Sequence, residues 1–152
     1  MDKYGYNDSE FWKNLKWPAT PNDDDVEVFR SYCRGSVLLL GSTRLLLPLC
    51  DEAWDMEPRY NNPKIKKRDW FGLDSHWDTI IVDGVLVYGK EYTERLLPVL
   101  LSKTDRLVVR SFLNPTWKTK YAIWFPLATD FDPVPQEHPI NEVYTFYIWN
   151  NK

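Results

Sequence analysis

A small-residue segment that could contact a ligand follows the first apolar run of the chain. Gly41 comes directly after residues 36–40, and Ser42 and Thr43 come next. Such a run is typical of a strand buried on both faces of a parallel sheet, and a glycine permits the sharp turn after it. We expect Ser42 or Thr43 to cap a helix over residues 42–50. A helix start placed there would offer free N–H groups and a positive dipole end to an anionic ligand.

Acidic residues lie where the next predicted strands end. Asp55 closes the second strand, with Glu57 just behind it, and Asp83 closes a later strand, directly before Gly84. The carboxyl ends of parallel strands share one edge of a sheet, which is where such sheets bind ligands. An acid at the end of the second strand can accept hydrogen bonds from two ribose hydroxyls. These residues therefore predict a nucleoside-shaped cleft.

The other predicted elements surround this edge. Hydrophobic periodicity indicates helices over 9–17, 26–33 and 91–101, besides 42–50. Strands are expected over 36–40, 52–56, 64–66, 78–83, 105–112, 117–127 and 142–149. Alternating strands and helices followed by a hairpin predict an α/β fold: a doubly wound, mostly parallel, Rossmann-like sheet of about seven strands. It would carry N-terminal helices and end in an antiparallel β-hairpin.

The length of 152 residues predicts one domain. We divide it into an N-terminal helical extension (1–35), a cofactor-binding core (36–112) and a C-terminal hairpin (113–152). The net charge of −3 argues against a nucleic-acid partner. Cys33 and Cys50 form no CxxC motif, so we expect reduced thiols, no metal site and a cytoplasmic location. No apolar run reaches the roughly 20 residues that span a bilayer, so no membrane association is expected.

Four segments, taken in order, resemble class I S-adenosylmethionine-dependent methyltransferases. They are the strand and turn VLLLGST (37–43), the acidic segment DEAWDMEP (51–58), the pair Asp69-Trp70 and the strand WDTIIVDG (77–84). The terminal hairpin looks like the sixth and seventh strands of that family. The resemblance implies S-adenosylmethionine as the cofactor and methyl transfer as the reaction.

The resemblance also implies residue roles in the first part of the cleft. Gly41, with Ser42 and Thr43, would hold the methionine part of the cofactor. Asp55 would bind the ribose hydroxyls, and Glu57 is the reserve candidate for that role.

Further along the chain, Asp69 would accept from the adenine amino group and Trp70 would pack beside the ring. Asp83 and Gly84 would border the sulfonium and its methyl group. Tyr88 and Tyr92 follow closely and are the candidates to contact the acceptor. No catalytic residue is indicated.

Our first hypothesis is an enzyme that methylates a small molecule. The alternative is a catalytically inactive protein of the same fold that binds the cofactor or a protein partner. An exposed patch of hairpin aromatics would favour self-association into a homodimer; these are Trp117, Tyr121, Trp124, Tyr144, Tyr147 and Trp149. A nicotinamide-binding domain is a third possibility, which the absence of a G-x-G-x-x-G motif disfavours.

Overall fold

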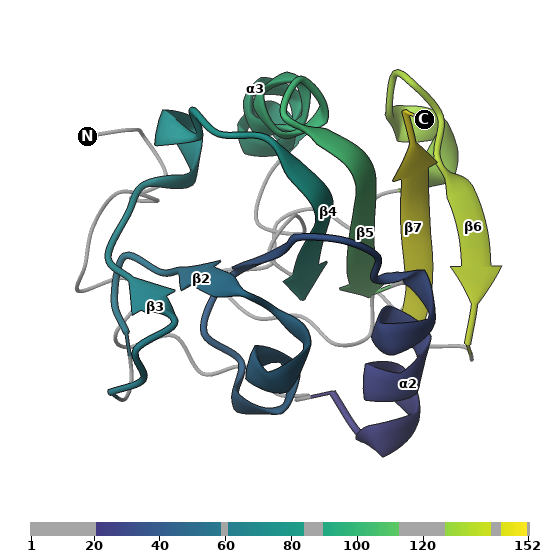
Figure 1. The fold of residues 1–152 in the computed structure, drawn as a ribbon. Helices are drawn as coiled ribbons and strands as arrows, with labels where there is room; N and C mark the ends of the chain where they lie inside the picture. Colours follow the sequence, from purple (N-terminus) through teal and green to yellow (C-terminus); the bar gives the residue numbers. More distant parts are fainter. Residues whose placement is uncertain (1–20, 59–60, 84–89, 113–126, 141–143, 152) are drawn as a thin grey trace.

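A seven-stranded sheet forms the centre of the structure (Figure 1). The computed structural model describes residues 21–58, 61–83, 90–112, 127–140 and 144–151. The strand order across the sheet is β3-β2-β1-β4-β5-β7-β6. The strands are β1 (Val37–Leu40), β2 (Glu52–Trp54), β3 (Ile65–Lys66), β4 (Trp77–Asp83), β5 (Thr104–Phe112), β6 (Gln136–Pro139) and β7 (Tyr144–Asn150).

The sheet reverses its direction of growth between β1 and β4. β1 pairs in parallel with β2 on one side and with β4 on the other. From there the chain adds β3 beside β2 and β5 beside β4, both parallel. β7 pairs antiparallel with β5 and with β6. This confirms the predicted doubly wound sheet with an antiparallel finish. In such sheets ligands bind where the strand order reverses, which here is at the carboxyl ends of β1 and β4.

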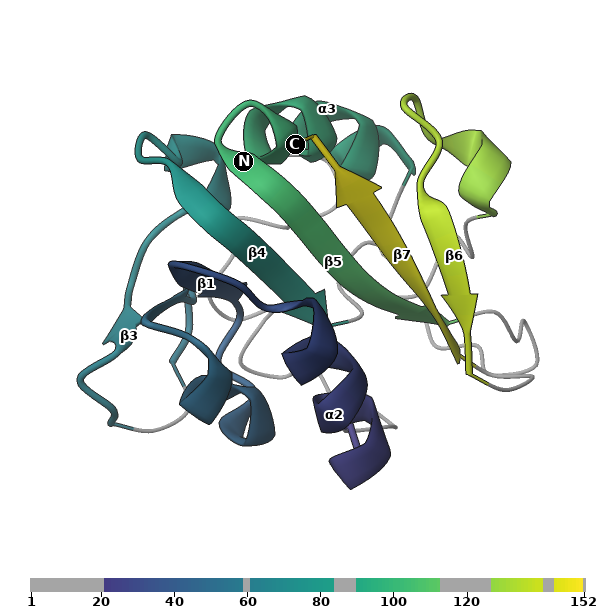
Figure 2. The same cartoon turned by 45° about the vertical axis from the view of Figure 1, so that its right-hand side comes forward.

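Helices cover both faces of the sheet (Figures 1 and 2). Alternate residues of each central strand point to opposite faces. On one face, Leu38 and Leu40 share a buried cluster with Leu96 of α3 (Lys90–Leu101). On the other face, Leu39 shares a cluster with Phe29 of α2 (Asp23–Tyr32). The sheet is thus buried on both sides, as the continuous apolar strands predict.

Both described α-helices agree with the sequence. Asn22 caps α2: its side chain accepts from the backbone N–H of Asp25, and the Asp25 side chain accepts from that of Asn22. This capping box satisfies N–H groups that the helix leaves without partners. α3 continues through Pro98, and this proline is exposed. The predicted helix 9–17 lies outside the described residues.

The helix expected over 42–50 is wrong. Gly41 is followed by two non-helical residues and then by a short 3₁₀ helix, η1 (Arg44–Leu49). Pro48 lies inside this segment and donates no backbone hydrogen bond, so an α-helix of full length is disfavoured. The side chain of Thr43 makes no capping hydrogen bond. The helix dipole that we expected at the cleft is therefore absent from this segment.

The hairpin also differs in its first arm. The predicted strand 117–127 lies outside the described residues, apart from residue 127, which precedes the 3₁₀ helix η4 (Ala128–Asp130). β6 forms instead at Gln136–Pro139, in a stretch that we expected to be a connection. It is an edge strand, the position in a sheet that tolerates a proline.

Cys33 and Cys50 are both free. Burial raises the pKa of each thiol to about 11, so both stay protonated at neutral pH. Among the described residues, no helix has the length and apolar character needed to cross a membrane.

Candidate functional site

The predicted Gly41 turn and the predicted ribose acid lie together beyond β1 and β2. The backbone N–H of Gly41 donates to the carbonyl of Trp54 at 2.8 Å, which holds the two strand ends side by side. The Ser42 hydroxyl donates a short hydrogen bond to Asp55 Oδ2. The backbone N–H of Glu57 donates to Asp55 Oδ1 at 2.9 Å. The Asp55 carboxylate is therefore fixed in orientation while it stays half-buried.

Gly41, Ser42 and Asp55 form a corner beyond the ends of β1 and β2. Gly41 has a φ of +115°, a conformation that disfavours any side chain, and a Cβ built there would meet no atom within 4 Å. The two Asp55 oxygens accept from the Ser42 hydroxyl and from the backbone N–H of Glu57, and a carboxylate oxygen can accept more than one hydrogen bond. An open backbone turn beside a fixed carboxylate suits a ligand that carries hydroxyl groups.

Two tryptophans close the corner on the β2 side. Trp70, in the 3₁₀ helix η2 (Trp70–Gly72), donates from Nε1 to the carbonyl of Trp54 at 2.8 Å. The Arg68 guanidinium lies over the Trp54 ring, 5.1 Å from its centroid. Nε1 of Trp54 is buried and has no hydrogen-bond partner among the described residues. Asp69 is exposed, and its carboxylate accepts from the backbone N–H of Phe71 at 3.0 Å.

Asp83, at the end of β4, is part of a buried ion network. Nε of Arg110, on β5, lies 2.5 Å from Asp83 Oδ1. Nη1 of the same guanidinium lies 2.8 Å from Oδ2 of Asp25, in the first turn of α2. The ring of Tyr144 covers the guanidinium at 4.5 Å. The arginine side chain is 0% exposed, and those of Asp25 and Asp83 are 3% and 4% exposed.

Burial dominates the electrostatics of this network. It raises the pKa of Asp83 above its usual range; Arg110 opposes that shift and the Asp25 carboxylate adds to it. Burial likewise raises the pKa of Tyr144. We did not predict Arg110 or Asp25 as site residues. The signal was present, because an arginine that continues the apolar run of a buried strand (LVVR, 107–110) requires a buried counter-ion.

The predicted acceptor contacts are placed only in part. Tyr92 is buried, and its ring packs edge-on against Phe71 with centroids 5.4 Å apart. Gly84 and Tyr88 lie outside the described residues. Thr43 is half-buried beside the Gly41 turn.

The hairpin aromatics do not form the exposed patch that would favour a homodimer, as far as they are described. Tyr147 and Trp149 are buried in the core, and Tyr144 is half-buried over Arg110. The other three, Trp117, Tyr121 and Trp124, lie outside the described residues. Self-association stays a prediction.

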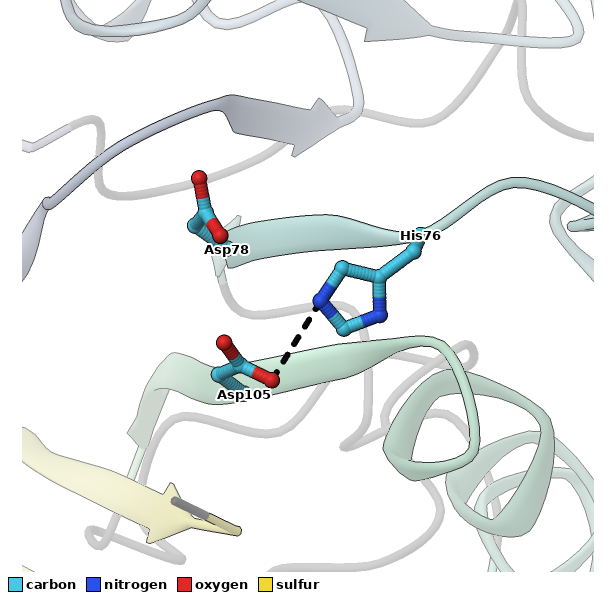
Figure 3. A group of neighbouring side chains, drawn as sticks. All are labelled: His76, Asp78 and Asp105. Carbon is cyan, nitrogen blue, oxygen red and sulfur yellow. Dashed lines mark ion pairs between the residues drawn. The ribbon is translucent and has the colours of Figure 1, made fainter.

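A second polar group lies at the opposite edge of the sheet, where β4 and β5 begin (Figure 3). Ligand atoms of His76, Asp78 and Asp105 lie within 4.8 Å of one another. His76 Nε2 is 3.3 Å from Asp105 Oδ1. Asp78 Oδ2 accepts from the backbone N–H of Ser36 at 2.7 Å. The hydrogen bonds from the backbone and side chain of Ser36 lower the pKa of Asp78. Both acids thus have partners that tie the starts of β1, β4 and β5 together.

The fold is similar to those of several solved structures. A magnesium protoporphyrin IX methyltransferase (ChlM) from Synechocystis PCC 6803, with bound SAH, superimposes with a TM-score of 0.61 at 14% identity, over 95% of each chain. The DhpI–SAH complex gives 0.60 at 15% identity, over 81% of this chain and 80% of that one. TehB from Haemophilus influenzae gives 0.60 at 13% identity, over 96% and 67%. The chain has the class I methyltransferase fold. No family model and no curated protein matches its sequence.

Proposed function

We propose that the protein transfers a methyl group from S-adenosylmethionine to a small-molecule acceptor. The observation that carries this proposal is the corner of Gly41, Ser42 and Asp55 at the point where the strand order reverses. Neighbours of the same fold were crystallised with the cofactor or its product bound. The net negative charge also argues for a small acceptor rather than a nucleic acid.

The chain's own residues would act by binding and orientation. In this proposal Asp55 accepts from the ribose hydroxyls, because the Ser42 hydroxyl and the Glu57 amide already fix its carboxylate. Gly41 lets the backbone approach the methionine part, with Ser42 and Thr43 beside it. Glu57 stays the reserve ribose ligand.

The adenine would lie on the side of Asp69 and Trp70. The Asp69 carboxylate is exposed and Trp70 is buried beneath it, so the acid is the one of the two that a ligand can reach directly. Asp83 and Gly84 would border the reacting end, near Tyr88 and Tyr92. When bound, the cofactor supplies an activated methyl group, and the protein accelerates the reaction chiefly by holding the acceptor in line.

Calorimetric titration of the protein with S-adenosylmethionine and with S-adenosylhomocysteine tests the proposal. We expect micromolar dissociation constants, equivalent to about −8 kcal/mol, and a loss of at least tenfold in Asp55→Asn. Asp105→Asn, an acid at the opposite edge of the sheet, is the matched control and should bind as the unmodified protein does. No binding of either ligand at millimolar concentration would refute the proposal.

The alternative is a cofactor-binding module without turnover. The observation that favours it is η1, because a six-residue 3₁₀ helix stands where we expected the helix that opens on the cleft. Incubation with methyl-labelled cofactor and a small-molecule extract separates the two. Label transferred to an extractable product supports the enzyme, whereas tight cofactor binding with no transfer supports the module.

A further inference from the structure

Among the described residues, the network of Asp25, Asp83 and Arg110 holds two acids and one base. Two carboxylates share one guanidinium, and all three side chains are at most 4% exposed. The groups that face one another come from four elements: Asp25 from α2, Asp83 from β4, Arg110 from β5 and the Tyr144 ring from β7. Charges held away from water interact strongly with their surroundings. A cation placed nearby would therefore be stabilised.

The network lies next to the ligand cleft. Leu40 is paired in register with Val82, so Asp83, the next residue of β4, lies beside Gly41, the next residue after β1. These two strands are the ones between which the strand order reverses. Asp25 reaches the same edge, because its carboxylate contacts Arg110, which is paired in register with Asp83. The network thus lies at the carboxyl ends of β4 and β5, next to Gly41.

Building on the proposed function, we propose that this network makes the cleft discriminate by charge between the methyl donor and its spent product. The sulfonium of S-adenosylmethionine carries a positive charge. When its methyl group passes to a lone pair of the acceptor, the electrons of the broken carbon–sulfur bond stay on sulfur and leave a neutral thioether. The network attracts the donor and not the product, so Asp25 and Asp83 would be specificity-determining residues that favour product release.

Burial and the Asp25 carboxylate raise the pKa of Asp83, which favours its neutral form, while Arg110 opposes that shift. Asp25 offers the cleaner perturbation. It lies on α2 rather than on a strand end, and Asn is nearly isosteric with it. Its neighbour Asp24 is an exposed acid in the same helical turn and provides a matched control of identical charge.

The test measures dissociation constants for both ligands by calorimetry in the unmodified protein, Asp25→Asn and Asp24→Asn. We expect Asp25→Asn to weaken binding of S-adenosylmethionine about tenfold and to leave that of S-adenosylhomocysteine within twofold, whereas Asp24→Asn changes neither. The amine analogue sinefungin, which carries an ammonium in place of the sulfonium, should follow the donor. If circular dichroism shows Asp25→Asn to be unfolded, Asp83→Asn replaces the other acid of the network.

The outcomes separate the two proposals. Asp25→Asn and Asp83→Asn could weaken binding of the donor and of the product equally, or could weaken binding of neither ligand. Either result refutes the charge discrimination, while cofactor binding stands. If the unmodified protein binds neither ligand, the proposed function fails and this inference fails with it.

Discussion

Arg110 is the residue whose replacement should destabilise the fold most clearly. Arg110→Met keeps the length of the side chain under the Tyr144 ring but removes the guanidinium. Two carboxylates, 3% and 4% exposed, then lose the cation that each contacts at 2.8 Å or less. Removing one partner of a buried ion pair typically costs about 3–5 kcal/mol. For a chain of this length, each kcal/mol lowers the melting temperature by about 2–4 °C, so we expect a decrease of about 6–20 °C.

Urea denaturation followed by circular dichroism measures this loss, provided that the transition is two-state. Arg106→Met is the matched control, because Arg106 lies on the same strand and donates to the carbonyl of Tyr32 and to Asn150. It is partly exposed, so its loss should cost about 1 kcal/mol. The triple replacement Asp25→Asn, Asp83→Asn and Arg110→Met should recover most of the stability. A single Arg110→Met variant that is no less stable than the control would refute the reasoning.

Three further predictions test the corner and the opposite edge. Gly41→Ala should lose about 1–3 kcal/mol, because alanine is strained at a φ of +115° although its Cβ meets no atom; urea denaturation measures it, and an unchanged midpoint would contradict it. Trp70→Phe should lose about 0.5–1.5 kcal/mol, because the Trp54 carbonyl loses one of its two donors and keeps the backbone N–H of Gly41; the same assay applies. Hydrogen bonds from Ser36 lower the pKa of Asp78 in the folded state, so its contribution to stability is present above about pH 4 and is lost as the pH falls further. Denaturation from pH 7 to pH 2 should therefore show a smaller pH dependence in Asp78→Asn than in the unmodified protein.

The central strands could be predicted because their signal is local. Val37–Leu40 and the core of Trp77–Asp83 are uninterrupted apolar runs, and a short run of this kind is typical of a strand buried on both faces. Gly41 marked the end of β1 for an equally local reason, its positive φ. The capping box of α2 is also visible within four residues, Asn22 to Asp25. Each of these features is decided by neighbours along the chain.

The misses depend on tertiary context. The leucines before Pro48 suit a helix by composition, yet the proline and the short distance to β2 allow only a 3₁₀ turn. Gln136–Pro139 has no strand pattern of its own and is a strand because β7 lies beside it. Arg110 is paired with an acid 85 positions earlier in the chain, a separation that no spacing rule covers.

The same dependence explains why Asp25 has a larger role than its sequence position indicates. As the third residue of α2, it completes a capping box, a local task that needs only its carboxylate and Asn22. The Oδ2 atom of Asp25 that accepts from the backbone N–H of Asn22 also accepts from Arg110. One oxygen therefore fixes the start of the helix and joins it to the end of β5, beside Asp83. A helix anchored in this way holds the Asp25 carboxylate next to Arg110, as the proposed charge discrimination between donor and product would require.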